Sequence, residues 1–145
     1  MKKVFVILTI LGSICTTSIY AQSKTPSSVL SSFQSSFDNP ADATWSKVKD
    51  LYRVDFILED QKASAFFNED GDLIASTRNV TLLQIPMSLK SNLKKYLHDY
   101  EVSGLFEVNR EDGIIYYATM QDNKSQLMLE STSSGDWVAT KKITY

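Results

Sequence analysis

His98 is the only histidine of the chain and the side chain best suited to proton transfer near neutral pH. A histidine base needs a nucleophile to activate, and the sequence contains no serine motif of the G-x-S-x-G type. A histidine that binds a metal needs further ligands that converge on the same ion, and no second histidine is present. We therefore interpret His98 as a surface residue of a helix and assign no catalytic, metal or cofactor site.

Acidic residues gather at two other places, and both invite a test for chemistry. If Gly71 were the sixth position of an EF-hand loop, Phe66 and Thr77 would occupy its first and last positions, where calcium requires oxygen ligands that neither can supply in that form. A hairpin turn accounts better for residues 68–72. The pair Glu59-Asp60 is also predicted to be a solvated turn, because no second carboxylate pair stands at a spacing suited to acid–base catalysis.

The first 21 residues have the pattern of an export signal. Two lysines precede an apolar run over residues 4–14, and a short polar stretch ends at Ala21, after which we expect cleavage. The run is too short to span a bilayer in the mature chain. A lipoprotein signal at Cys15 fits less well, because the preceding Ile14 is not a small residue.

The mature chain, residues 22–145, is long enough for one compact domain with its own core. Cleavage would remove the only cysteine, so no disulfide is expected. Removing two leader lysines from the 15 basic residues leaves 13 against 17 acidic ones. Without a basic cluster, nucleic acid and anionic membrane surfaces are poor partners. We expect a periplasmic or secreted protein that does not insert into the membrane.

An internal repeat organises the mature chain. GDLIAST at residues 71–77 is similar to GDWVATK at residues 135–141, and the similarity extends backwards to two expected helices. Pro26 and Pro86 each precede apolar residues three and seven positions later, as at the first turn of a helix. The apolar stripe of the second helix continues to Tyr100. We therefore predict two repeats, residues 26–83 and 86–145.

Each expected helix is followed by short alternating segments with turn signals between them, which is typical of antiparallel strands. We expect strands at residues 44–49, 51–59, 62–68 and 72–80, and at residues 103–109, 113–121, 124–131 and 136–144. The predicted fold is α+β: two repeats of a helix plus a four-stranded antiparallel sheet, with the sheets joined into one curved layer and both helices on one side. Separate, unconnected cores for the two repeats would contradict this fold.

Strand alternation separates two sheet faces, and the face away from the helices is unusually apolar. Its predicted partner-binding residues are Ile57, Phe66, Ile115, Tyr117 and Met128. We expect them to be exposed together as a patch interrupted by Arg53 and Asp55, since an apolar patch on a sheet usually marks an interface. Aromatic residues on strands also belong to cores, so a core position stays open for this set and is favoured for the two tryptophans.

Several motifs together are similar to those of a known family. They are Pro26-x-x-Val29-x-x-x-Phe33, Trp45, Tyr52-x-Val54-x-Phe56 and a turn centred on Gly71. They resemble the secreted PepSY-like proteins with a beta-lactamase-inhibitor-like fold, which are common in the Bacteroidota, and the resemblance covers residues 26–144. Members usually carry Phe-Pro before Ala, whereas Phe37-Asp38-Asn39-Pro40 alters that corner here. The resemblance implies a periplasmic, non-enzymatic module and brings no catalytic residues.

Two functional hypotheses follow. The first is a secreted binding or inhibitory module that engages a periplasmic or extracellular protein through a sheet face. The alternative is a carrier of a small apolar or peptide ligand, held in a groove between the sheet and the helices. An enzyme is disfavoured, because His98 alone cannot supply an acid–base partnership.

Overall fold

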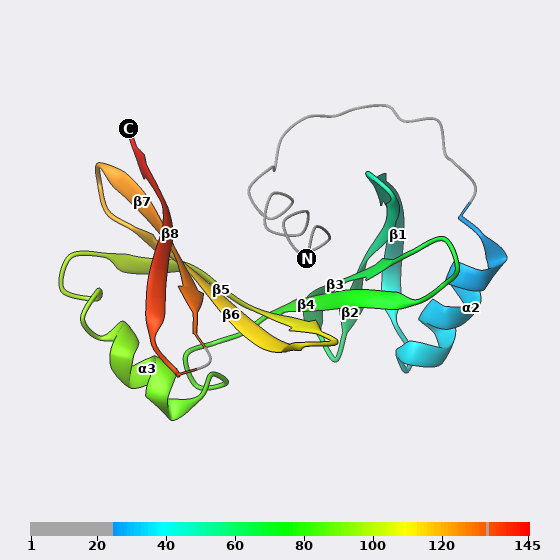
Figure 1. The fold of residues 1–145 in the computed structure, drawn as a ribbon, viewed down its shortest axis with the longest axis horizontal. Coiled ribbons are helices and arrows are strands. Elements are labelled where there is room, and N and C mark those ends of the chain that lie inside the picture. The colour runs from blue at the N-terminus through cyan, green and yellow to red at the C-terminus, as the bar shows by residue number, and fades with distance from the viewer. Residues whose placement is uncertain (1–24, 133) are drawn as a thin grey trace.

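The computed structural model describes residues 25–132 and 134–145, and the predicted leader lies outside them. Their elements follow in the order helix, four strands, helix, four strands (Figure 1). The helices are α2 (Ser27–Ser36) and α3 (Met87–Leu93). The strands are β1 (Ala41–Val48), β2 (Leu51–Leu58), β3 (Gln61–Phe67), β4 (Leu73–Asn79), β5 (Glu101–Arg110), β6 (Gly113–Gln121), β7 (Ser125–Ser131) and β8 (Trp137–Thr144).

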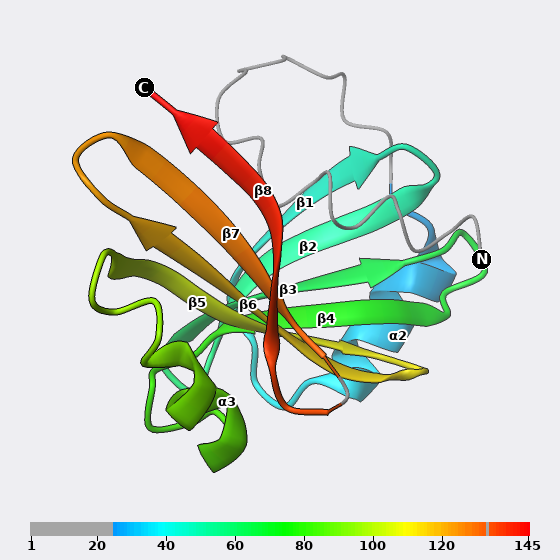
Figure 2. The same cartoon turned by 60° about the vertical axis from the view of Figure 1, so that its left-hand side comes forward.

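The strands form one eight-stranded antiparallel sheet in which each strand pairs with the next one in the chain. The sheet is curved, and its two ends rise on either side of its centre in Figure 1, as the turned view in Figure 2 confirms. Glu59 and Asp60 form the turn between β2 and β3 with φ of 50° and 62°. Positive φ at both central residues matches the twist of a two-residue hairpin, so the predicted solvated turn is confirmed.

Gly71 and Gly135 end two further turns, before β4 and β8, with φ of 95° and 81°. The Gly71 N–H donates to the Asn68 carbonyl at 3.2 Å, and the Gly135 N–H donates to the Thr132 carbonyl at 3.0 Å. Each glycine also lies against a helix: a Cβ at Gly71 would be 2.9 Å from the Ser28 carbonyl oxygen of α2. The hairpin turn predicted for residues 68–72 is therefore confirmed. Both the positive φ of Gly71 and its closeness to the Ser28 carbonyl require glycine at this position.

Both helices cover the same face of the sheet. Ala65 on β3 pairs with Ser76 on β4, and Ser76 pairs with Asn109 on β5. Directly paired residues point to the same side, so the face beneath α2 continues into the face beneath α3. The prediction that the helices share one side of a continuous sheet is right.

The apolar side chains beneath the two helices nevertheless form separate clusters. The α2 cluster contains Val29, Phe33, Tyr52, Val54, Phe56, Ala65 and Phe67, and the α3 cluster contains Val80, Ile85, Leu89, Leu93, Leu105, Ala118, Met120, Leu127, Leu129 and Trp137. Between them, Arg78 on β4 donates from Nε and Nη2 to the two carboxylate oxygens of Glu107 on β5, at 3.0 and 3.2 Å. The expectation of connected cores thus fails on this face, because an ion pair occupies its centre.

Helix α3 is shorter than its apolar stripe suggested. It ends at Leu93, and successive turns follow in which the Tyr96 N–H donates to the Leu93 carbonyl and the Leu97 N–H donates to the Lys94 carbonyl. These i→i−3 bonds tighten the chain before β5 while Tyr96 still packs against the α3 cluster. The side chain of His98 lies in these turns and is 92% exposed, so its surface position is confirmed and its helical position is wrong.

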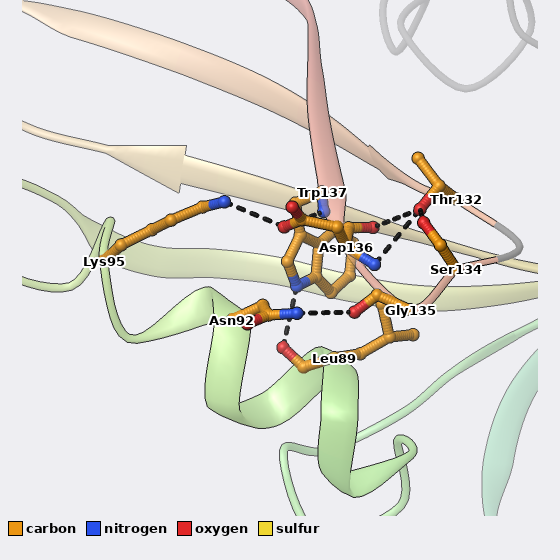
Figure 3. Close-up of polar contacts among 8 residues, drawn as sticks. All are labelled: Leu89, Asn92, Lys95, Thr132, Ser134, Gly135, Asp136 and Trp137. Atoms are coloured by element: carbon orange, nitrogen blue, oxygen red, sulfur yellow. Dashed lines mark hydrogen bonds and ion pairs between the residues drawn. The ribbon is translucent and has the colours of Figure 1, made fainter.

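Side-chain hydrogen bonds attach α3 to the beginning of β8 (Figure 3). The indole Nε1 of Trp137 donates to the Leu89 carbonyl at 2.8 Å, and Asn92 Nδ2 donates to the Gly135 carbonyl at 2.9 Å. Trp137 is 3% exposed, which confirms its predicted core position. The bond to Leu89 satisfies the one polar atom of a buried indole, so this side chain fixes both the position and the rotation of α3.

Asp136 organises the same corner from the solvent side. Lys95 Nζ lies 2.8 Å from Asp136 Oδ1, and the Trp137 N–H donates to that oxygen at 2.7 Å (Figure 3). The hydrogen bond from Lys95, followed by that from the Trp137 N–H, lowers the pKa of Asp136. The hydrogen bond to Asp136 raises the pKa of Lys95. Since both side chains are half exposed, we assign this pair a modest role in stability.

Candidate functional site

The candidate site is the side of the sheet that neither helix covers, which we name the helix-free face. The residues predicted for it are Ile57, Phe66, Ile115, Tyr117 and Met128. Phe66 pairs with Arg53 and Ala75, and Tyr117 pairs with Phe106 and Glu130. All five predicted residues have the parity of this face, so the prediction of their side of the sheet is confirmed.

Their expected exposure is wrong for the two aromatic residues. Phe66 is 1% exposed and Tyr117 is 7% exposed. Together with Ala75 and Val108 they form a third apolar cluster, which we name the concave cluster. The curved sheet brings side chains on this face towards one another, and the rings of Phe106 and Tyr117 stack with their centroids 5.6 Å apart.

The concave cluster draws its four buried residues from β3, β4, β5 and β6, so it crosses the boundary between the two halves of the sheet. It supplies the apolar contact between halves that the helix-covered face lacks. At its edge, burial and then the nearby charge of Glu130 raise the pKa of Tyr117 to about 12.

The other three predicted residues are partly exposed and lie in different surroundings. Ile115 packs against the concave cluster, whereas Ile57 borders a groove on β2 and Met128 lies further along the sheet on β7. The structure therefore brings Phe66, Ile115 and Tyr117 together and leaves Ile57 and Met128 outside their cluster.

A groove of about 530 Å³ crosses the helix-free face from β1 to β5, and we name it the β1–β5 groove. Its lining residues are Asp42, Thr44, Arg53, Asp55, Phe56, Ile57, Lys62, Ala63, Ser64, Phe66, Thr77, Asn79 and Phe106. Phe56 and Ala63 belong to the α2 cluster or pack against it on the other face, so the apolar side chains on the groove side are those of Ile57, Phe66 and Phe106. The groove thus combines three apolar side chains with charged and polar ones. Such a mixed surface can hold an apolar group and direct it with hydrogen bonds.

A fixed polar network forms part of the groove wall. Asp55 Oδ1 accepts hydrogen bonds from Arg53 Nε at 2.9 Å, from Arg53 Nη2 at 2.7 Å and from Ser64 Oγ at 2.5 Å. The guanidinium carbon of Arg53 also lies 5.8 Å from the centroid of the Phe66 ring. Charge-assisted bonds and ring contact hold Arg53 in place, so its charge is directed at Asp55.

Lys62 is the exposed cation of the groove. It pairs in register with Ile57, and it forms no ion pair with any residue that the structure describes. Asp42 lines the groove from β1, where a register shift between Ala41 and Thr44 and a φ of 53° mark a bulge. The groove therefore carries opposite charges on different strands, and these charges are not paired with each other.

Sequence reasoning treated Arg53 and Asp55 only as interruptions of a patch and did not single out Lys62 or Phe106. The i, i+2 spacing of Arg53 and Asp55 indicates one strand face, so their contact was within reach of the pattern. Phe106 was not, because Leu105, Phe106 and Val108 place apolar side chains on both faces of β5. The spaces beneath both helices are filled by apolar clusters, and the groove lies on the other face from the one proposed for a carried ligand.

Within residues 25–132 and 134–145, no three histidine, cysteine, aspartate or glutamate residues are grouped as a metal ion would require. No helix formed by the same residues has the length and apolar character needed to cross a bilayer.

No family model matches the chain, and no curated protein matches it. Solved structures do resemble it. A protein of Bacteroides eggerthii, assigned provisionally to the periplasm, has a TM-score of 0.76 at 18% identity, over 83% of this chain and 90% of that one. A BLIP-like protein of Bacteroides fragilis has a TM-score of 0.71 at 12% identity, over 94% of this chain and 93% of that one.

A DUF2874 family protein of Bacteroides uniformis is also similar, with a TM-score of 0.71 at 12% identity over 82% of this chain and 88% of that one. At such low identity the likeness concerns the path of the chain and not its chemistry. The eight-stranded antiparallel sheet with two helices on one face is a BLIP-like fold.

Proposed function

We propose that this protein is an exported, non-enzymatic binding module that engages a protein partner through its helix-free face. One observation carries the proposal: the helix-free face has a groove of about 530 Å³, whereas apolar clusters fill the space beneath both helices. A neighbour in fold is named BLIP-like and another is assigned provisionally to the periplasm, which agrees with binding and with export.

The non-enzymatic part of the proposal rests on the surroundings of His98. Its side chain is 92% exposed, and its nearest acidic oxygen is that of Asp99 at 4.0 Å. A general base works from a position that controls its proton and its substrate, and an exposed turn offers neither.

We also propose that residues 22–145 are a single PepSY-like domain built of two repeats, residues 26–83 and 86–145. The matched turns at Gly71 and Gly135 support this interpretation, because each follows the third strand of its half and contacts the helix that begins that half. In each turn a side-chain oxygen, from Asn68 or Thr132, accepts a bond from the aspartate N–H four residues later.

Affinity capture with matched variants tests the binding function. Wild-type protein, an Ile57→Arg variant in the groove and a Leu97→Arg variant on the helix side would each be immobilised and exposed to periplasmic extract. Ile57 lies outside the apolar clusters and Leu97 is 42% exposed, so both variants should fold, which circular dichroism would verify. A stoichiometric protein retained by wild type and Leu97→Arg but lost by Ile57→Arg supports the proposal. Equal retention by all three proteins contradicts the assigned face.

The carrier hypothesis is the second candidate, now placed in the β1–β5 groove. The groove volume of about 530 Å³ falls within the roughly 300–1,000 Å³ typical of small-molecule sites. Native mass spectrometry of protein purified from its own cells would distinguish the two. The carrier is favoured if the wild type contains a bound small molecule that Ile57→Arg lacks. The binding module is favoured if the wild type contains no bound molecule and still captures its partner.

A further inference from the structure

We propose that the outer surface of α3 and the turn before it rest on an anionic phospholipid surface. In this contact Leu83 and Met87 reach into the headgroup layer, and Lys90 and Lys94 bind lipid phosphates. We name these four residues the α3 patch. The inference goes beyond the proposed function, because the α3 patch lies on the helix-covered side of the sheet and the β1–β5 groove lies on the other.

Two protruding apolar side chains define the patch. Among the residues that the structure describes, Leu83 and Met87 are the most exposed large apolar side chains, at 85% and 76%. Leu83 lies in the turn that the Gln84 N–H closes by donating to the Thr81 carbonyl at 3.0 Å, and Met87 is the first residue of α3. Single exposed leucines are common, but two apolar side chains that protrude from one short segment indicate a contact surface.

The same surface is basic. Lys90 and Lys94 follow Met87 by three and seven positions, and Lys94 keeps the helical conformation just after α3 ends, so they lie along one side of the helix. Residues 80–98 contain three lysines and no aspartate or glutamate. One of these lysines pairs with Asp136, whereas Lys90 and Lys94 form no ion pair with any residue that the structure describes. The prediction that anionic membranes are poor partners rests on the charge of the whole chain, which this surface does not share.

The other helix shows that packing does not require these side chains. At the positions sixty residues earlier, α2 has Ser27, Leu30 and Gln34, and it carries no charge. Both helices bury two apolar side chains against the sheet, so each is held in place without its outer residues. The fold therefore does not account for Met87 and the two lysines, which points to a contact with a molecule outside the chain.

The shape and composition of the patch favour a bilayer over a protein. The patch belongs to the convex side of the curved sheet, where Figure 1 shows α3 below the strands. Apolar side chains that protrude from a convex surface enter a headgroup layer without a complementary pocket. Protein interfaces rely on aromatic or arginine anchors, and residues 83–94 contain neither. Lysine suits the bilayer, because its apolar stem lies along the acyl boundary while its ammonium reaches the phosphates.

Contact through the α3 patch leaves the helix-free face open to solvent. The helices and the groove lie on opposite sides of the sheet, so a chain that rests on α3 turns its groove away from the bilayer. The contact is peripheral and needs no membrane-spanning helix. Weak binding of this kind keeps an exported protein near a phospholipid surface and still allows it to dissociate.

Co-sedimentation with large unilamellar vesicles tests the inference. The protein is the mature chain, residues 22–145, which contains every helix and strand of the described fold and lacks the leader, so the leader cannot bind lipid in its place. One set of vesicles contains equal parts of phosphatidylglycerol and phosphatidylcholine, and the other contains phosphatidylcholine alone. We expect about tenfold tighter binding to the anionic set, and added salt should weaken this binding because it screens the lysine charges.

Two double variants assign the binding to the patch. Lys90→Gln with Lys94→Gln should weaken binding to the anionic vesicles by about tenfold or more, since each lysine near such a surface contributes roughly fivefold. Leu83→Ser with Met87→Ser should weaken it by about tenfold, because the polar side chains no longer favour the headgroup layer. All four positions are at least partly exposed, so both variants should fold, which circular dichroism would verify.

A matched charge control lies on the other side of the sheet. Lys62 pairs in register with Ile57, and Lys141 pairs with Met128, which places both exposed lysines on the helix-free face. Lys62→Gln with Lys141→Gln removes the same charge as the patch variant. It should change vesicle binding by less than about twofold, because these lysines point away from the bilayer and salt screens their charge over that distance.

Several results would overturn the inference. Equal binding to both sets of vesicles, no binding to either, or an equal loss in the charge control would each contradict it. A protein captured from periplasmic extract by wild type and lost by Lys90→Gln with Lys94→Gln, without any vesicle binding, would show that the patch serves an acidic protein instead. The Ile57→Arg variant separates this inference from the proposed function. If it loses the captured partner and no protein binds vesicles, only this inference fails; if vesicles bind as expected and no partner is captured, only the proposed function fails.

Discussion

Phe66 lines the β1–β5 groove and at the same time belongs to the concave cluster. Its side chain is 1% exposed, and the Arg53 guanidinium lies over its ring. Replacement of a buried aromatic side chain by alanine leaves a cavity, so Phe66→Ala should lower the free energy of unfolding by about 3–5 kcal/mol. Urea denaturation followed by circular dichroism measures this loss. Ile57→Ala, at a partly exposed site beside the groove, provides the control and should cost about 1 kcal/mol. Equal costs for both variants would show that Phe66 is not a core residue.

Tyr117 gives the same cluster a pH dependence. Burial and the charge of Glu130 raise its pKa to about 12, against about 10 in an unfolded chain. Between these values the folded state keeps a proton that the unfolded chain has lost, so the free energy of unfolding falls as the pH rises. The slope from this one group is about 1.4 kcal/mol per pH unit. Urea denaturation of wild type and Tyr117→Phe between pH 9 and 12 measures the difference in slope, and identical slopes would contradict the assignment.

At the scale of elements, the turns before β4 and β8 depend on glycine to different degrees. A Cβ at Gly71 would be 2.9 Å from the Ser28 backbone oxygen, whereas one at Gly135 would be 2.7 Å from Ser88 Oγ, a side chain that can rotate. Both have positive φ, which costs alanine about 1–2 kcal/mol. We expect Gly71→Ala to cost about 2–4 kcal/mol and Gly135→Ala about 1–3 kcal/mol in chemical denaturation. Gly104→Ala is the control: its Cβ would be 3.6 Å from Thr119, and the cost should stay within about 0.5 kcal/mol. The order fails if Gly104→Ala is as harmful as Gly71→Ala.

The elements themselves were largely predictable, because their signals are local. Alternation in Tyr52-Arg53-Val54 indicates β2 and its two faces, and the glycines after residues 70 and 134 locate the following strands. The end of α3 was not predictable, since Tyr96 continues the apolar spacing after the helix has ended. Burial of the helix-free face depends on sheet curvature, which no short pattern reports. The burial of Phe66 could therefore not be predicted from the sequence, because it depends on contact with Val108 and Tyr117 from other strands.

At the scale of the whole molecule, the concave cluster should make the two halves unfold together. Trp45 contacts the α2 cluster, with its ring centroid 5.4 Å from that of Phe33, and Trp137 belongs to the α3 cluster. The variants Trp45→Phe and Trp137→Phe each leave one tryptophan, so fluorescence reports one half and circular dichroism reports the sheet. We expect the two signals of each variant to give the same urea midpoint. A further Val108→Ala substitution weakens the shared cluster and should separate them. Separate midpoints without that substitution would mean that the halves unfold independently.

The pairing of every strand with its successor also has a kinetic consequence. Most pairings close only a short turn, and the exception is β4 with β5, which must bring together the ends of residues 80–100. The entropy cost of loop closure is thus concentrated in a single step. Topologies dominated by local pairing tend to fold quickly, because few contacts between distant residues must form before the native state is reached. Because the chain is synthesised from its N-terminus, β1–β4 can form hairpins before β5 becomes available. Docking of the second half against the first would then be the last event of folding, and the concave cluster would close over the completed joint.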